Sequence, residues 1–258
     1  MPELPDLQVF SHNLTKALKG KKVKRVEVHN AKKLNVSSKE LSAALEGKTL
    51  NRAERSGKEL HAHFSGDQVL GLHLMLNGKL YLFKEKNEQK YTIIKILFDD
   101  DSGLAMTDFQ GIATPTLNPE KTDVPDALSD ELDLKYLLAQ LQKKKTAVKN
   151  ILMDQHIVRG IGNAYADEIL WDAKISPFSI ARQIPEEKVK ELLKSIKNVL
   201  KDAEKQILKT HPDIIAGEVR DFLQVHNSKK KETPGGHKIH QKPIASRKTY
   251  YTDEQVEY

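Results

Sequence analysis

The most reactive group that the sequence offers is the nitrogen of Pro2, which directly follows Met1. Methionine aminopeptidases remove Met1 when a small residue follows, so we expect the mature chain to begin with a secondary amine. An α-amino group titrates near about 8, which leaves a neutral, nucleophilic fraction at cellular pH. Such an amine can attack a sugar C1′ and form an iminium, an electron sink for later elimination. Glu3 comes next and could move protons at the same centre.

Because many chains begin with Met-Pro, this amine needs support from other groups. Lys58 and His73 carry groups that could take part, although a lone lysine or histidine is more often a solvated surface residue. Gly160-Ile161-Gly162-Asn163 predicts a tight turn with backbone N–H groups at a helix start, which Asn163 could cap. By itself such a turn is a weak signal for a ligand site.

Lysine-rich segments make a polyanion a natural partner of the chain. The formal net charge is +6 and the pI is about 9.1. Lys145 and Lys149 are one helical turn apart and could face DNA, although the whole lysine cluster could equally be a solvated face. Charge alone does not decide between these interpretations.

The residue types present also restrict metal chemistry. The chain has no cysteine, which excludes disulfides, thiol catalysis and thiolate zinc sites. His237 and His240 have a short spacing, but no acidic or further histidine residue stands beside them in the sequence. A metal site there is a minor alternative, and we expect no metal or other cofactor.

No apolar run is long enough to span a bilayer, and the N-terminus lacks the apolar core of a signal peptide. We therefore expect a cytoplasmic protein without a membrane partner, associated with the nucleoid if it binds DNA.

The elements that must position these groups change in type along the chain. Apolar residues at helical spacing predict a helix over residues 7–18 with Asp6 as its N-cap. Residues 22–113 consist of short β-branched or alternating runs between turns, which predicts an antiparallel β-sandwich or barrel. A proline-bearing connection at 115–125 is followed by helical sequence to about Leu223. Its clearest helix is expected over residues 186–209, with the lysines on a solvated face.

The motifs above resemble, in order, those of the formamidopyrimidine-DNA glycosylase and endonuclease VIII family. The resemblance covers Met1 to Asp6, Arg55 to Leu60, Leu72 to Gly78, and Lys143 to Lys149 followed by Leu152 to Asp154 and Gly160 to Glu168. The last stretch is similar to the family's helix-two-turns-helix module almost residue for residue.

The resemblance implies an α+β fold in three parts. Residues 1–118 would form the catalytic β-sandwich domain with its leading helix, 119–223 the helix-two-turns-helix domain, and 224–258 a C-terminal hairpin. The family normally ends in a four-cysteine zinc finger. We expect here a zincless finger packed through Ile244, Tyr250 and Tyr251, with Arg247 reaching DNA, and a disordered basic tail is the alternative.

The resemblance also implies roles for individual residues. Pro2 and Glu3 would be catalytic together with Lys58, while His73, Lys145, Lys149 and Asn163 would bind DNA. Leu76 takes the position of a methionine that fills the gap left by an extruded base.

The chain departs from the family in three further places. No arginine is present in Thr107 to Gly111, where the family has one beside the orphaned base, and Asp6 replaces a glutamate. The segment from Gln224 to His240 is short and could lack the loop that closes over 8-oxoguanine.

The resemblance, together with the chemistry of Pro2, implies a monomeric, cofactor-free glycosylase and strand-cleaving lyase acting on double-stranded DNA. Its substrates would be Fapy purines first, with oxidised pyrimidines, hydantoins and abasic sites next. Two alternatives are a damaged-DNA-binding protein that has lost efficient catalysis and a DNA-binding module without lesion preference.

Overall fold

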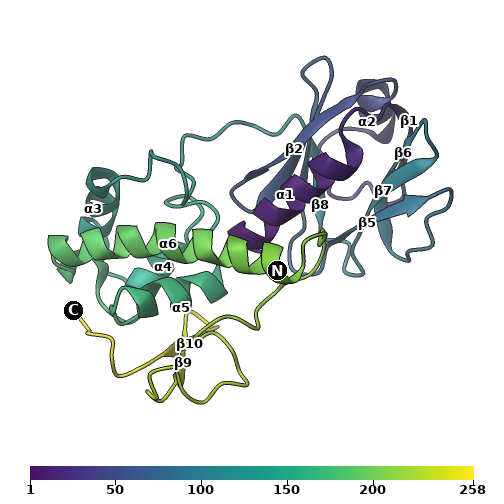
Figure 1. Cartoon of the computed structure of the whole chain (residues 1–258). Helices are drawn as coiled ribbons and strands as arrows, with labels where there is room; N and C mark the ends of the chain where they lie inside the picture. The colour runs from purple at the N-terminus through teal and green to yellow at the C-terminus, as the bar shows by residue number, and fades with distance from the viewer. The chain divides into compact units, whose positions relative to one another are not determined.

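The computed structural model describes residues 1–258, which divide into two compact units. The first unit contains residues 1–122 and 207–218, and the second contains residues 123–206 and 219–258. Figure 1 shows helices and strands in both parts of the chain, so the predicted α+β class is confirmed. Residues 224–258, expected as a third domain, share the second unit with the helices.

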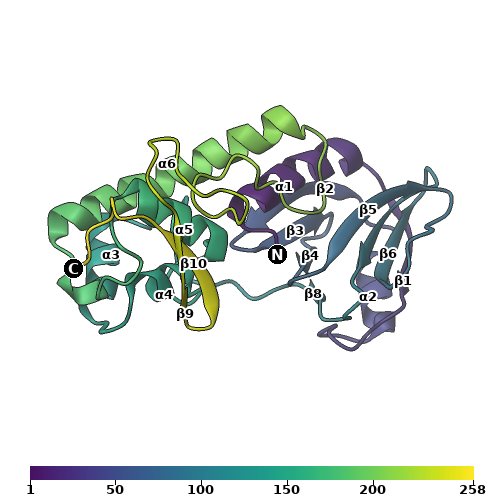
Figure 2. The same ribbon diagram turned by 90° about the horizontal axis from the view of Figure 1, so that it is seen from below.

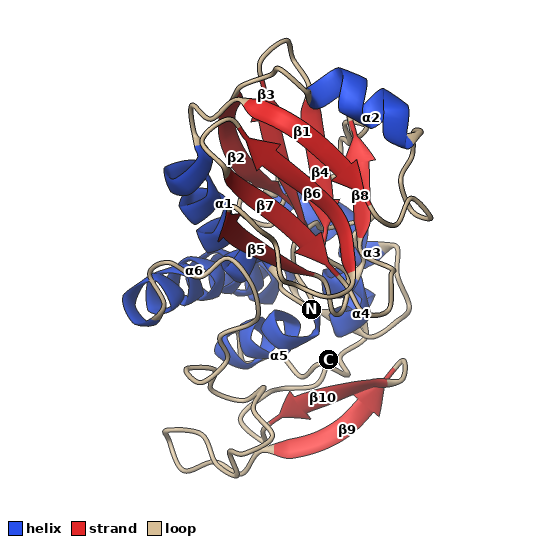
Figure 3. Ribbon diagram, turned by 90° about the vertical axis from the view of Figure 1, so that its right-hand side faces the viewer, coloured by secondary structure: helices blue, strands red, loops and turns tan.

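Two four-stranded antiparallel sheets form the first unit (Figure 3). One sheet has the order β1 (Val23–Val28), β6 (Thr92–Phe98), β7 (Ser102–Thr107), β5 (Lys79–Lys84). The other has the order β2 (Leu50–Ser56), β3 (Glu59–Phe64), β4 (Val69–His73), β8 (Thr114–Leu117). The predicted antiparallel β-sandwich is therefore confirmed.

Alternation along β3 shows why this sequence forms a half-buried strand. Leu60, Ala62 and Phe64 are buried in the core of the unit, whereas Glu59, His61 and His63 lie on the opposite face. Side chains of a strand alternate between its two faces, so the polar residues gather on one outer face of the sheet.

Two helices accompany the sandwich, and the sequence predicted only the first. Helix α1 spans Leu4–Leu18 and begins earlier than expected, with Glu3 rather than Asp6 as its N-cap. Asp6 lies inside the first turn, where its carboxylate accepts a hydrogen bond from the Glu3 N–H at 2.9 Å. Helix α2 (Ser38–Leu45) was missed, although Ser37 and Glu40 form a capping box at its start.

The second unit consists of helices and a terminal hairpin. The helices are α3 (Leu134–Gln142), α4 (Val148–Met153), α5 (Asn163–Asp172), the 3₁₀ turn η1 (Ala181–Gln183) and α6 (Glu186–Thr210). The helix expected over 186–209 is confirmed as α6, whose last residues belong to the first unit. None of the helices has the length and apolar character that crossing a membrane requires.

Strands β9 (His240–Ile244) and β10 (Arg247–Tyr251) pair antiparallel at the end of the chain. Figures 1 and 2 both show this hairpin beside α5, and contacts between α5 and β10 agree. The predicted hairpin is confirmed, and the alternative of a disordered tail is wrong.

Candidate active site and DNA-binding groups

The N-terminus places the expected nucleophile at the start of α1. Pro2 and Glu3 are both buried, and Glu3 holds the N-cap position. Met1 is present in this structure, and its ammonium group forms an ion pair with Oε1 of Glu218. While Met1 is attached, the nitrogen of Pro2 belongs to a peptide bond, so it becomes an amine only after Met1 is removed.

Lys58 lies in the tight turn between β2 and β3. Ser56 pairs with Glu59, which leaves Gly57 and Lys58 as the turn residues, and Gly57 has a φ of 60°. The side chain of Arg55 donates to the carbonyl of Gly57 at 3.1 Å and to Oε1 of Gln8 at 3.0 Å. Because Gln8 belongs to α1, Arg55 ties the lysine turn to the helix that carries the reactive end.

His73 is the last residue of β4, and a backbone contact defines the tautomer of its ring. The backbone N–H of Met75 donates to Nδ1 of His73 at 3.1 Å, so the proton of the neutral ring resides on Nε2. Burial lowers the pKa of His73, and the charge of Lys58 lowers it further while Glu59 opposes the change. The ring is therefore suited to donate a neutral hydrogen bond from Nε2 to an oxygen atom.

Leu76 projects from the loop that follows His73. Its side chain is 60% exposed, whereas Leu74 is buried and Met75 is half-buried. Met75 has a φ of 51°, which turns the chain sharply at this point. Of the three apolar residues in this loop, Leu76 is the one with the exposure that a gap-filling residue needs.

A second exposed apolar residue, Phe109, lies in the loop after β7 and is 63% exposed. The side chain of the neighbouring Gln110 accepts a hydrogen bond from Asn77 at 2.6 Å, so the loops of Phe109 and Leu76 are joined. The buried carboxylate of Asp108 accepts three backbone N–H groups of its own loop. Two ordered, joined loops therefore present two apolar side chains to solvent.

The two lysines expected to face DNA have different positions. Lys145 is exposed and precedes α4. Lys149 lies inside α4, is fully buried, and forms an ion pair of 2.7 Å with the equally buried Asp167 of α5. The expectation that the Lys149 amine faces DNA does not agree with this position.

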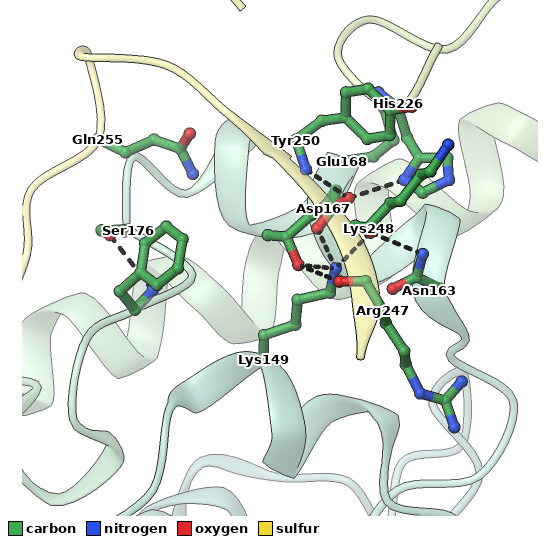
Figure 4. Close-up of polar contacts among 12 residues, drawn as sticks. Lys149, Asn163, Asp167, Glu168, Ser176, His226, Arg247, Lys248, Tyr250 and Gln255 are labelled. Atoms are coloured by element: carbon green, nitrogen blue, oxygen red, sulfur yellow. Dashed lines mark hydrogen bonds and ion pairs between the residues drawn. The ribbon is translucent and has the colours of Figure 1, made fainter. Parts of the chain in front are cut away.

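Instead, Lys149 and Asp167 join the terminal hairpin to the helices (Figure 4). The Lys149 ammonium donates to Oγ1 of Thr249 at 2.7 Å. Asp167 accepts the backbone N–H of Tyr250 at 2.9 Å and contacts Nδ1 of His226 at 2.7 Å. In a chain without cysteine, this buried network supplies polar cross-links that a metal would supply in a zinc finger.

The next residue, Glu168, holds the segment that leads to the hairpin. Its carboxylate accepts the backbone N–H groups of Gln224, Val225 and His226 at 2.7–2.8 Å. Burial raises the pKa of Glu168 above its ordinary value, although these hydrogen bonds act in the opposite direction. Neither Asp167 nor Glu168 was among the residues expected to have a role. The signal for them was an acidic pair inside a helix whose neighbouring residues are apolar and buried.

Asn163 is the first residue of α5, but it does not cap the helix as expected. Gly162 is the N-cap, and Nδ2 of Asn163 donates to the carbonyl of Lys248 at 2.9 Å. Gly160 has a φ of 104°, and its N–H donates to Oε1 of Gln155 at 2.9 Å. The tight turn is thus confirmed, with the Gly160 N–H already engaged inside the protein.

The hairpin also packs through apolar groups, as predicted. Ile244 and Tyr250 are buried, Tyr250 meets the ring of His226 edge-on, and Tyr251 meets the ring of Phe178 in the same manner. Arg247 is exposed directly after the turn, and Figure 4 shows its guanidinium extending away from the buried ion pair.

Comparisons with known proteins match both parts of the chain. The model of the formamidopyrimidine-DNA glycosylase N-terminal domain matches residues 1–114, and that of the H2TH domain of the same enzyme matches residues 124–211. The formamidopyrimidine-DNA glycosylase of Lactobacillus gasseri is 32% identical and aligns over 80% of this chain and 78% of its own. That of Mycoplasma mobile is 30% identical over 97% of each chain.

Solved structures of Lactococcus lactis Fpg are similar over the whole chain. Its complex with DNA containing an abasic site is 27% identical, with a TM-score of 0.88 over 99% of this chain and 100% of that one. Its complex with DNA containing Fapy-dG is 28% identical with the same coverage and a TM-score of 0.87. Since the two domain models together match most of the sequence, the chain belongs to the formamidopyrimidine-DNA glycosylase family.

Proposed function

We propose that this chain, a DNA glycosylase of base excision repair by its family, uses Pro2 as nucleophile and then cleaves the strand. The observation that carries this proposal is the position of Pro2. It is buried directly before Glu3, the N-cap residue of α1, and its nitrogen becomes the terminal amine when the peptide bond to Met1 is cleaved.

The reaction follows from the chemistry of a secondary amine. The nitrogen of Pro2 attacks C1′ of the damaged nucleotide, the bond from C1′ to the base breaks, and the base leaves with a proton. The amine loses its own proton, the bond from C1′ to the ring oxygen O4′ then breaks, and O4′ takes up a proton, so that an iminium joins protein and sugar. Loss of a proton from C2′ then allows β-elimination of the 3′ phosphate, and a further δ-elimination releases the 5′ phosphate. Glu3 is the acid and base for the protons at the sugar. No metal or other cofactor takes part in these steps.

Side chains of the first unit would position the damaged nucleotide. Lys58 and the Nε2–H of His73 would bind phosphates flanking the lesion, the first as a charge and the second as a neutral donor. Leu76 would occupy the space of the extruded base, with Phe109 on the joined loop as a second apolar contact. The loop of Phe109 contains no arginine, so discrimination of the opposite base would be weak.

The second unit would supply further phosphate contacts. Lys145 and Arg247 are exposed cations, and Asn163 starts the helix after the glycine turn. We propose that the protein acts as a monomer on double-stranded DNA of the nucleoid in the cytoplasm. Lys149 is not among the proposed contacts because it is buried.

The proposed substrates are Fapy purines, followed by oxidised pyrimidines, hydantoins and abasic sites. The beginning Pro2-Glu3-Leu4-Pro5 supports the Fapy-directed branch of the family, and Lactococcus lactis Fpg has been seen bound to Fapy-dG and abasic DNA. The short segment from Gln224 to His240 argues against strong activity on 8-oxoguanine.

Borohydride trapping with abasic DNA tests the nucleophile. The processed wild-type chain should give a covalent adduct, whereas Pro2→Gly and a chain with an uncleaved N-terminal extension should give none. Lys188→Ala, which removes an amine from the exposed face of α6, is the matched control and should trap normally. A wild-type chain that lacks Met1 and forms no adduct would refute the lyase.

The missing arginine and the substitution at Asp6 favour a second candidate, a damaged-DNA-binding protein of the same fold. It predicts tight binding to abasic DNA without trapping. A cleavage panel over Fapy-guanine, 8-oxoguanine, thymine glycol, hydantoin and abasic sites would then show no product.

A further inference from the structure

A cluster of histidine and glutamate residues lies on the outer face of the sheet formed by β2, β3 and β4. His61 and His63 are two residues apart on β3, so both side chains leave the same face of the sheet. Glu54 of β2 stands directly opposite His61 in the antiparallel register. Three residues that commonly bind metals therefore converge from two neighbouring, hydrogen-bonded strands.

The ligand atoms of these three residues lie close together. One nitrogen of each histidine and one carboxylate oxygen of Glu54 are all within 4.8 Å of one another. Around a tetrahedral Zn²⁺ with bonds of about 2.0–2.2 Å, neighbouring ligand atoms are about 3.4 Å apart. Nε2 of His63 and Oε1 of Glu54 are closer than this at 2.7 Å, and Glu54 is nearly half-exposed, so a small rotation of its side chain can open the pair to the required spacing.

His63 carries a buried nitrogen aimed at the centre of this cluster. Its Nε2 is 2.7 Å from Oε1 of Glu54, but the two atoms are not aligned as a hydrogen bond. A buried polar atom without a hydrogen bond is costly, and a shared cation would satisfy both atoms at once. A cation bound by both groups would satisfy Nε2 of His63 once the carboxylate has moved slightly away from it.

Two neighbours fix the orientation of the Glu54 carboxylate, one at each of its oxygen atoms. Nε of Arg52 donates to Oε2 of Glu54 at 3.1 Å, which leaves Oε1 directed at His63. Arg52 repels a cation, but it also fixes the carboxylate in a monodentate position.

His61 has an orienting partner of its own. Its Nε2 is 2.9 Å from Oε2 of Glu59, and this carboxylate lies over Gly71 on β4. A Cβ atom at Gly71 would come within 2.7 Å of Oε1 of Glu59, so the glycine makes room for it. A carboxylate behind a ligating histidine is the common second partner at protein metal sites.

We propose that Glu54, His61 and His63 form a site for a divalent transition metal of the Zn²⁺ class. Two imidazoles and one carboxylate are a known zinc donor set, with water in the remaining position. The ion would link β2 to β3 next to the turn that carries Lys58. This site differs from the sequence expectation of no metal, and it is separate from the proposed reaction at Pro2.

A second pair of histidines provides the matched control. His237 contacts Glu254 at 3.6 Å, and His240 contacts Asp253 at 3.1 Å. Each histidine thus has a separate acidic partner, and the pair shows no common point for one ion.

Co²⁺ and Zn²⁺ titrations of the metal-free full chain test the proposal. Wild type should bind one Zn²⁺, and Co²⁺ should give the visible absorption of a nitrogen- and oxygen-bound ion. His61→Gln, His63→Gln and Glu54→Gln should each weaken Zn²⁺ binding by at least about tenfold and remove the Co²⁺ absorption. The double variant His237→Gln/His240→Gln should behave as wild type.

The variants must first melt like wild type in the presence of a chelator, which separates loss of a ligand from loss of the fold. Zn²⁺ should then raise the melting temperature of wild type and of the His237→Gln/His240→Gln control only. A wild-type chain that does not bind Zn²⁺, or binding that survives His63→Gln, overturns the proposal. Binding lost only in the His237→Gln/His240→Gln variant also overturns it and would place the ion on the hairpin.

Discussion

Lys149 and Asp167 form a 2.7 Å ion pair in which neither side chain is exposed to solvent. Removing one partner of a buried pair leaves an uncompensated charge, which commonly costs about 3–5 kcal/mol. We expect Lys149→Met to lower the free energy of unfolding by about 3 kcal/mol, measured by urea denaturation. Asp167 would retain His226 and the N–H of Tyr250, which places the effect at the lower end of this range.

The control for this prediction is Lys188→Met, because Lys188 pairs with Glu191 on the surface of α6. Exposed pairs of this kind contribute about 0–1 kcal/mol. Lys149→Met/Asp167→Asn should recover part of the lost stability, since no buried charge then remains unpaired and the amide oxygen can still accept the N–H of Tyr250. Equal effects of Lys149→Met and Lys188→Met would show that the buried pair does not stabilise the hairpin.

The position of Lys149 also shows where sequence reasoning was insufficient. A spacing of four residues places Lys145 and Lys149 on one face only if both lie in the same helix. Helix α4 begins at Val148, so Lys145 precedes it and the helical argument does not apply. The helix-two-turns-helix motif was recognisable from local sequence. The partners of Lys149 were not, because Asp167 lies in another helix and Thr249 lies in the hairpin at the end of the chain.

The alternation of apolar and polar residues made the β-sandwich predictable, and the 3.6-residue period of apolar residues made α6 predictable. Both patterns can be recognised within a short stretch of sequence. The cluster of Glu54, His61 and His63 was not found, since its third member depends on the register between β2 and β3. Short spacing instead singled out His237 and His240 as a possible metal pair. Their acidic partners, residues 253 and 254, lie further along the chain and are separate for each histidine.

His73 should contribute to DNA binding as a neutral donor. His73→Ala is expected to weaken binding to abasic-site DNA roughly tenfold, the effect of losing one hydrogen bond to a charged group. His73→Gln places an amide N–H near the position of Nε2 and should retain most of the affinity. Fluorescence anisotropy at constant salt measures both, and a weaker effect of the alanine variant than of the glutamine variant would contradict the assignment.

The lowered pKa of His73 sets the sign of its pH dependence. The folded-state pKa lies below the unfolded value near 6.5, so this residue contributes stability above 6.5 that is lost as pH falls through the folded pKa. The affinity ratio of wild type to His73→Gln should be constant above pH 6.5, where the ring is a neutral donor. It should rise as the pH falls through the folded-state pKa, because a phosphate favours the protonated ring. A ratio that falls at acidic pH would indicate that His73 does not contact a phosphate.

Leu76 is predicted to act on the DNA and not on the fold. Because its side chain is 60% exposed, Leu76→Ala should change the free energy of unfolding by no more than about 0.5 kcal/mol. It should nevertheless slow base excision at least tenfold, because an extruded base is no longer replaced in the stack. Single-turnover cleavage measures the rate, and Leu82→Ala on β5, also an exposed leucine, should leave it unchanged.

Arg247 is predicted to bind a phosphate without reading sequence. Each phosphate neutralised by a cation contributes about one unit to the slope of log K against log salt. Arg247→Ala should therefore weaken binding to damaged and intact duplex alike and reduce that slope by about one. Lys205→Ala removes a charge from α6, whose lysines were read as a solvated face, and should leave the slope unchanged. An unchanged slope in Arg247→Ala would mean that the exposed arginine after the hairpin turn does not reach the DNA backbone.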